Sequence, residues 1–162
     1  MSDLYELTMA LAIRGPLSGG EVAELRWHAG LGGGVLPASG ARGIVTEFPV
    51  VVVDDFGVPT VEDDPRPVLG RTGMALRVGG ESTADVTPTA GGWVVSVRQE
   101  LHPDEFDAVG VLLTWLAARA DDAHTSPDGS VVLGRLRFLE DIEPAPLMFR
   151  DGRVNWPDRE AG

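Results

Sequence analysis

The sequence predicts an α+β fold, namely a ferredoxin-like βαββαβ antiparallel sheet with two helices on one face, a long Gly/Pro-rich insertion at about residues 32–90 and a C-terminal hairpin. Three observations lead to this prediction. Two segments that alternate between apolar and polar residues are each followed by a helix signal. Residues 30–92, between these two units, hold 13 of the 21 glycines and six of the 12 prolines. A third alternating segment and an Asp-Gly turn follow the second helix.

The first strand–helix unit has clear boundaries. Residues 4–14 alternate between large apolar side chains and small or polar ones, as in a strand with one buried face. Gly15-Pro16 ends this strand. Ser18 is followed three residues later by Glu21, which is the capping-box pattern of a helix start. Gly30 is suited to end that helix, because glycine readily adopts a left-handed backbone.

The insertion has the least regular pattern. Two runs in it are candidate strands, at residues 44–53 and 74–78. Asp54-Asp55 and residues 62–65 are predicted to be acidic turns. Because compact domains rarely contain long loops without structure, we expect the insertion to lie over the core, next to the exposed side of the second helix.

The second unit consists of a strand at residues 93–100 and the strongest helix of the chain, at residues 103–120. Pro103 suits a first helical position, and acidic residues follow it at the positive end of the helix dipole. Between residues 108 and 118 the only polar side chain is Thr114. A helix that is apolar on all sides is covered on more than one side, either by the insertion or by a second protein. The interface candidates on the side that the strands leave uncovered are Leu112, Trp115 and Arg119.

The C-terminal part completes the sheet. Residues 131–140 alternate as a third strand, and residues 147–154 contain the Asp-Gly signal of a two-residue hairpin. We expect a single domain at residues 1–156 and a flexible tail at residues 157–162.

Composition excludes several classes of function. The formal net charge of −12, from 25 acidic and 13 basic residues, argues against binding to nucleic acid or to an anionic membrane surface. The same charge suits a basic protein partner, although it also serves solubility. The chain has no Cys, which excludes disulfides, thiolate metal sites and Cys nucleophiles. It has no Lys either, which excludes a Walker-type phosphate loop and Schiff-base chemistry.

The sequence also indicates a compartment and a source. It begins without the basic and apolar regions of a signal peptide, and it has no apolar stretch of about 18 residues. We therefore expect a cytoplasmic protein that does not span a membrane. Frequent Arg, Ala, Gly and Val together with the lack of Lys suggest a GC-rich bacterial genome.

Polar residues gather on one face of the predicted sheet, turned away from the helices. They are Glu6, Thr8, Arg14, Ser96, Arg98, Glu100, Arg135 and Arg137. Guanidiniums beside carboxylates could hold an anionic ligand through bidentate bonds. The ligand-binding residues would then be Arg14, Arg98, Glu100, His102, Arg135 and Arg137. A solvated face with cross-strand charge pairs is the commoner arrangement, and packing on another subunit is a third possibility.

The three histidines are not spaced as metal ligands, so no metal site is expected. His28 lies at the end of the first helix, where a positive charge is favoured. His102 lies beside Asp104 and Glu105 at the start of the second helix, as a helix-start residue or as a general base. The first role is the commoner one. His124 lies in a polar loop.

No catalytic or cofactor motif was found. The glycine run at residues 30–34 follows a helix instead of a strand, which excludes a dinucleotide site, and no Gly-x-Ser-x-Gly is present. We expect no cofactor. The sequence favours a non-catalytic protein-interaction module that forms a homodimer or binds a protein partner, as immunity, antitoxin and adaptor proteins do. The alternative is a small-ligand-binding protein or enzyme that uses the polar sheet face, with its arginines holding an anion and Glu100 or His102 as base.

Overall fold

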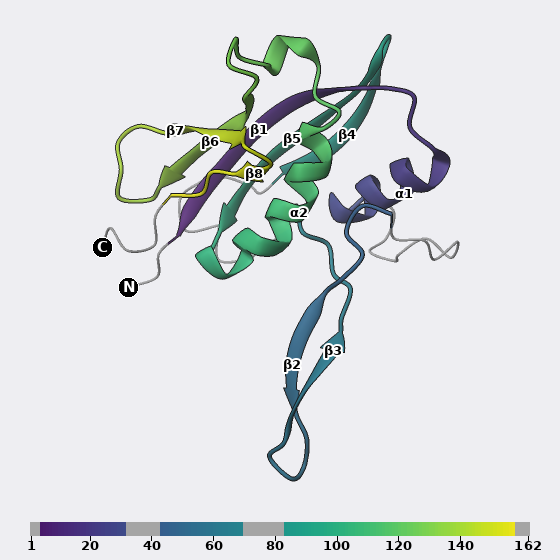
Figure 1. Cartoon of the computed structure of the whole chain (residues 1–162), viewed down its shortest axis with the longest axis vertical. Coiled ribbons are helices and arrows are strands. Elements are labelled where there is room, and N and C mark those ends of the chain that lie inside the picture. Colours follow the sequence, from purple (N-terminus) through teal and green to yellow (C-terminus); the bar gives the residue numbers. More distant parts are fainter. Residues whose placement is uncertain (1–3, 32–42, 70–82, 158–162) are drawn as a thin grey trace.

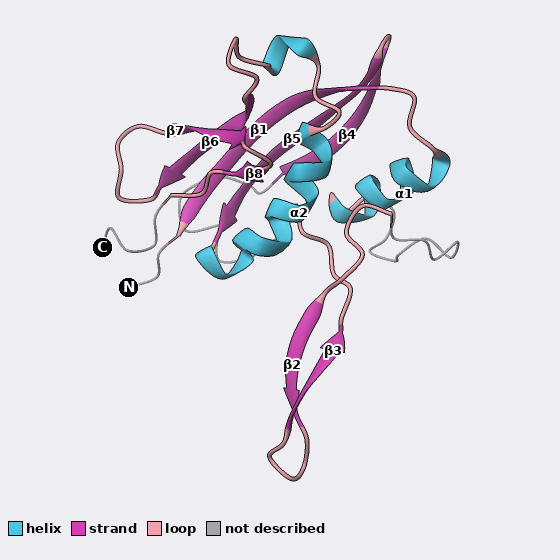
Figure 2. Cartoon of the chain, in the orientation of Figure 1, coloured by secondary structure: helices cyan, strands magenta, loops and turns pink. Residues whose placement is uncertain are grey.

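The computed structural model describes residues 4–31, 43–69 and 83–157, and its main feature is a six-stranded antiparallel sheet with the strand order β4-β5-β1-β6-β7-β8 (Figure 1). The strands of this sheet are β1 (Tyr5–Arg14), β4 (Thr83–Thr89), β5 (Gly92–Leu101), β6 (Val131–Phe138), β7 (Ala145–Arg150) and β8 (Arg153–Val154). A separate two-stranded sheet consists of β2 (Pro49–Val53) and β3 (Pro59–Asp63). The helices are α1 (Gly19–His28) and α2 (Phe106–Ala117), with short 3-10 helices at Pro103–Glu105 and Asp122–His124 (Figure 2).

Strand β1 is central to the core. It pairs with β5 along its full length and with β6 over its first four residues. Its alternate side chains are at most 3% exposed, and they are Leu7, Met9, Leu11 and Ile13. Helix α2 crosses this face of the sheet (Figure 1), and the ring centres of Tyr5 and Phe106 lie 5.5 Å apart. The strands and the second helix that hydrophobic periodicity predicts are therefore confirmed.

Two glycines allow neighbouring strands to approach β1 closely. A Cβ atom on Gly92 of β5 would overlap the carbonyl oxygen of Ile13. A Cβ atom on Gly134 of β6 would overlap the carbonyl oxygen of Thr8. Only glycine fits at these two positions without a shift of the backbone.

Strand β6 does not keep the regular alternation that the sequence predicts for residues 131–140. Its register against β7 shifts between Val132 and Gly134, which is a β-bulge. Val131 is buried before the shift and Leu136 after it, because the extra residue at the bulge moves all the following side chains to the other face.

The predicted ferredoxin-like βαββαβ arrangement with two helices on one face is wrong. The described chain is mostly sheet, with eight strands and only two α-helices. Strands β7 and β8 extend the main sheet beyond β6. Within the predicted insertion, residues 49–63 form a hairpin of their own, and residues 83–89 form β4, an unpredicted strand that pairs with β5 at the other edge of the main sheet. Helix α1 lies near the edge strand β4 instead of covering the sheet centre (Figure 2). The coarser α+β class is confirmed.

Both predicted ends of α1 are confirmed. Ser18 Oγ accepts a hydrogen bond from the Glu21 N–H at 3.1 Å, and Glu21 Oε1 accepts one from the Ser18 N–H at 2.8 Å. Gly30 follows the helix with a φ of +75°. Local sequence therefore determines where this helix starts and stops.

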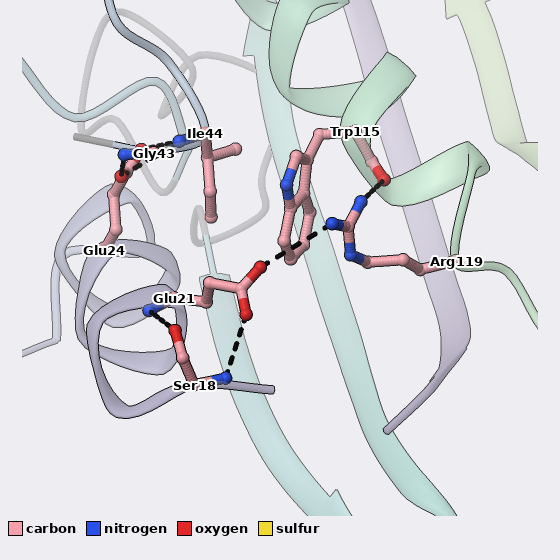
Figure 3. A network of polar contacts seen from close by, with 7 residues as sticks. All are labelled: Ser18, Glu21, Glu24, Gly43, Ile44, Trp115 and Arg119. Atoms are coloured by element: carbon pink, nitrogen blue, oxygen red, sulfur yellow. Dashed lines mark hydrogen bonds and ion pairs between the residues drawn. The ribbon is translucent and has the colours of Figure 1, made fainter. Parts of the chain in front are cut away.

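The inner side of α1 holds a buried polar cluster. Glu24 is 2% exposed and accepts hydrogen bonds of 2.7–3.2 Å from the backbone N–H groups of Gly43 and Ile44 (Figure 3). It also accepts one of 2.9 Å from the Val45 N–H. His28 Nε2 lies 3.3 Å from Glu24 Oε2. Burial lowers the pKa of His28, and the carboxylate of Glu24 opposes this effect only in part. The lowered pKa disfavours the positively charged form of His28 that was expected at the helix end.

The insertion lies only partly over the core. Its buried apolar residues, among those that the structure describes, are Ile44, Val45, Phe48, Val68, Leu69 and, in β4, Val86. The hairpin at residues 49–63 projects away (Figure 1). The predicted strand at residues 44–53 begins only at Pro49, because the N–H groups of Ile44 and Val45 bind Glu24 instead of a neighbouring strand. The predicted turn at residues 62–65 begins inside β3. The predicted strand at residues 74–78 and residues 158–162 of the predicted tail lie outside the described residues.

No helix in the described part of the chain is long and apolar enough to cross a membrane.

Candidate protein-interaction site

The hairpin β2–β3 projects from the domain below the helices (Figure 1). We call residues 47–64 the arm. Its strands pair in antiparallel register, with Val51 opposite Val61. All residues from 51 to 66 are exposed, and because successive side chains of a strand point to opposite faces, both faces of the hairpin are open.

The arm carries large apolar side chains that the rest of the described chain does not cover. The exposed fractions are 70% for Val51, 62% for Val53, 91% for Phe56, 52% for Val58 and 72% for Val61. Single exposed apolar residues are common on protein surfaces, but a contiguous group of them marks an interaction site. The arm is therefore the candidate site of this protein.

The tip of the arm is an ordered turn. Asp54 Oδ1 accepts hydrogen bonds from the N–H groups of Phe56 at 2.8 Å and Val58 at 2.9 Å. The Asp54 N–H donates in turn to the Val58 carbonyl at 3.0 Å. Gly57 supplies the left-handed backbone that the turn requires, with a φ of +78°. These bonds fix the backbone around Phe56 at the far end of the arm.

The base of the arm is fastened to α1. The Phe48 N–H donates to Asp63 Oδ1 at 2.8 Å, and the Asp64 N–H donates to the Phe48 carbonyl at 2.9 Å. The Phe48 ring is stacked against the His28 ring and lies edge-on to Trp27, with centroid distances of 6.2 Å in both cases. The exposed hairpin is thus attached to the domain through a buried aromatic cluster.

A pocket of about 590 Å³ lies between the base of the arm and the first turns of α2. Its apolar lining is formed by Phe48, Pro49, Val50, Pro67, Val68, Ala108, Val109 and Val111. The charged residues that line it are Glu47, Arg66, Asp104, Glu105 and Asp107. A volume of this size is within the usual range of ligand sites.

Acidic residues dominate the charge of the arm. It contains no basic residue. Its six acidic residues are Glu47, Asp54, Asp55, Glu62, Asp63 and Asp64. The resulting charge of −6 is half of the net −12 of the chain. A cation at the base of the arm is Arg66, whose Nη2 lies 3.2 Å from Asp64 Oδ2.

The structure brings together most of the predicted polar sheet face. Cross-strand pairing with β1 places these residues on one face: Glu6, Thr8, Ser96, Arg98, Glu100, Arg135 and Arg137. Glu6 Oε2 lies 3.6 Å from Arg98 Nη2 and 3.9 Å from Arg137 Nη2. Arg14 lies at the far end of β1, where its guanidinium is 3.3 Å from Asp122. These contacts are the charge pairs of a solvated face, and binding of an anionic ligand there stays a prediction.

His102 takes part in the start of the helical segment before α2. Its Nδ1 accepts a hydrogen bond from the Asp104 N–H at 3.2 Å, and its own N–H donates to Glu105 Oε2 at 2.9 Å. This reciprocal pattern is that of a capping box. The contacts are those of a helix-start residue.

The three predicted interface residues of α2 have different surroundings. Leu112 is fully buried. The Arg119 guanidinium lies 3.8 Å from the centre of the Trp115 ring and donates to the Trp115 carbonyl at 3.2 Å (Figure 3). It also lies 3.6 Å from Glu21 Oε2 of α1. Helix α1 therefore contributes to covering this side of α2, and a role of Trp115 in an interface stays a prediction.

Within residues 4–31, 43–69 and 83–157, no group of three or more His, Asp or Glu side chains could hold a metal ion. Comparison with protein-family models, with curated proteins and with solved structures finds no match.

Sequence reasoning finds part of the arm and misses its exposure. Residues 50–53 are four consecutive valines, a run that normally indicates a strand buried on both faces. The segment from Asp54 to Val58 contains the Gly of a hairpin loop, and a second short run with high strand propensity follows it. These signals are sufficient to predict the hairpin, but only its first strand is among the predictions, which place an acidic turn at residues 62–65. No signal in them shows that neither face is covered.

Proposed function

We propose that this protein is a protein-interaction module and that the arm is the element that binds the partner. The observation that carries the proposal is the group of exposed apolar side chains on an ordered hairpin, with Phe56 at its tip. Full burial of one such side chain contributes roughly 1.5–3 kcal/mol. A partner that covered several of them would therefore gain substantial binding free energy.

The geometry of the hairpin supports the same proposal. A two-stranded sheet has two open edges, and each edge can pair with a strand from another chain. Isolated two-stranded hairpins are also marginally stable in water. A partner that adds a strand or covers a face would supply the contacts that the domain itself does not provide. Immunity, antitoxin and adaptor proteins act by association of this kind, and those classes stay predictions.

Site-specific photo-crosslinking tests the proposal. The photoreactive residue p-benzoylphenylalanine is placed at position 56 or 61 of the arm, in the organism that makes the protein. Ile142 is the control position, because it is an exposed apolar residue outside the arm, with 95% exposure. We expect one defined cross-linked product from both arm positions and none from position 142.

The partner is then identified and purified, and its affinity for two variants is measured by calorimetry. The triple variant Val51→Thr, Val53→Thr and Val61→Thr removes apolar area from the arm, and we expect it to weaken binding at least about tenfold, which corresponds to roughly 1.4 kcal/mol. The control Arg98→Ala with Arg137→Ala alters the opposite, polar face of the sheet and leaves binding unchanged. Identical products from positions 56 and 142, or equal effects of the two variants, would contradict the proposal.

A further inference from the structure

The pocket at the base of the arm is lined by apolar and by acidic side chains. Val50 and Val68 line it from the insertion, and Val111, which is 48% exposed, lines it from α2. Its exposed acidic residues, here called the rim, are Glu47, Asp104 and Asp107. This combination matches a long basic side chain, which buries its aliphatic stem along apolar surface and keeps its charged group in water.

The charges around the pocket are unbalanced. Four carboxylates, from Glu47, Asp104, Glu105 and Asp107, line it together with a single guanidinium, from Arg66. That guanidinium is already in contact with Asp64. The rest of the arm, beyond the pocket, adds further acidic residues and no basic one. An approaching cation is therefore attracted to the whole region, whereas an anion is repelled.

We propose that the arm and this pocket bind a basic segment of a partner polypeptide, in which Arg or Lys side chains alternate with apolar ones. The inference rests on the proposed function and names the chemistry of the partner. Apolar side chains of the segment contact the valines of the arm, and a basic side chain enters the pocket with its charged group among the rim carboxylates. Arg is favoured over Lys at such a site, because a guanidinium forms bidentate bonds with carboxylates.

Charge also argues against a second copy of this chain as the partner that binds the arm and the pocket. Two arms would bring two sets of six acidic residues together. Few arginines of a second copy are available for the rim, since at least six of the nine that the structure describes already have an acidic neighbour. These six are Arg14, Arg66, Arg98, Arg119, Arg137 and Arg150. A nucleic acid is excluded by the sign of the charge.

Fluorescence anisotropy with labelled peptides tests the inference. The probes are three eight-residue peptides in which Leu alternates with Arg, with Gln or with Glu. We expect the Arg peptide to bind at least about tenfold more tightly than the Gln peptide, because several carboxylates of the pocket attract its guanidinium groups. The Glu peptide does not bind. Raising the salt concentration weakens binding of the Arg peptide, since salt screens exposed charges.

Two triple variants with equal changes of net charge separate the pocket from the overall charge. Glu47→Gln, Asp104→Asn and Asp107→Asn neutralise the rim, and we expect the Arg peptide to lose about tenfold in affinity. Glu140→Gln, Asp141→Asn and Glu143→Gln neutralise an exposed loop outside the arm and the pocket, and binding changes by less than about twofold. Circular dichroism and thermal unfolding of both variants confirm that they fold.

Each outcome supports or overturns the inference. Equal losses in the two triple variants, or equal binding of the Arg and Gln peptides, would overturn it. A concentration-dependent dimer in light scattering that the Thr variant of the arm abolishes would identify a second copy as the occupant. In each of these cases the cross-linking result for the arm still decides the proposed function by itself, so the two proposals can fail separately.

Discussion

Strand β1 and the arm show how differently one protein can use similar residues. Both consist of residues with high strand propensity, and both pair in regular antiparallel register. The apolar side chains of β1 are at most 3% exposed, whereas Val61 in the arm is 72% exposed. The difference lies in what surrounds the strands, because α2 covers β1 and no described element covers the arm. We infer that β1 contributes to folding and that the arm is available for binding.

The sharpest test of this comparison replaces one residue in each region. Leu11→Ala in β1 should lower the free energy of unfolding by about 2–5 kcal/mol, because it leaves a cavity in the buried core. Val61→Ala in the arm should change it by less than about 0.5 kcal/mol, as for other exposed positions. Chemical denaturation of the two variants measures both values. Similar losses would show that the arm is part of the folding core.

A smaller effect is expected where the two regions join. Glu24 holds the backbone of residues 43–45, which lead into the arm. Glu24→Gln leaves only one acceptor oxygen for these N–H groups, so we expect a loss of about 1–3 kcal/mol in the free energy of unfolding. Glu62→Gln, an exposed carboxylate of β3, is the matched control and should cost less than about 0.5 kcal/mol. Equal values for the two variants would mean that Glu24 does not anchor this segment.

The smallest expected effect is a pH dependence of the free energy of unfolding, caused by His28 in the buried polar cluster at the base of the arm. Burial lowers the pKa of His28 below its ordinary 6.5, so below about pH 6.5 the unfolded chain takes up a proton that the folded chain does not. Stability is therefore lost as the pH falls from 6.5 towards the folded pKa, at no more than about 1.4 kcal/mol per pH unit. The free energies of unfolding of the protein and of His28→Phe are compared at pH 7.5 and 5.5. A wild-type protein that loses no more stability than the variant would contradict this assignment.

Features that depend on neighbouring residues were predictable from the sequence. The alternation of β1 and the cap formed by Ser18 and Glu21 both follow from patterns within a few residues. The polar sheet face was also predictable, because alternation and register together place Glu6 beside Arg98 and Arg137.

Features that depend on distant segments were not predictable. The ferredoxin-like prediction is wrong because β7 and β8 extend the sheet beyond β6 and because α1 lies near the edge strand β4 and binds the insertion through Glu24, Trp27 and His28. Burial of His28 has the same origin, since Phe48 of the insertion stacks on it. The exposure of the arm depends on the absence of a covering element among the described residues, which no local pattern reports.

The close approach of β5 and β6 to β1 at Gly92 and Gly134 has a consequence for how the sheet can be altered. Each glycine faces a carbonyl oxygen of β1 where no larger residue fits. If β1 slid along its neighbours by two residues, the same faces would stay buried, but side chains from the flanking positions would meet those carbonyls. The two glycines therefore help to fix the register of the sheet. They are compatible with the observed pairing of the strands and disfavour nearby registers that have the same hydrophobic pattern.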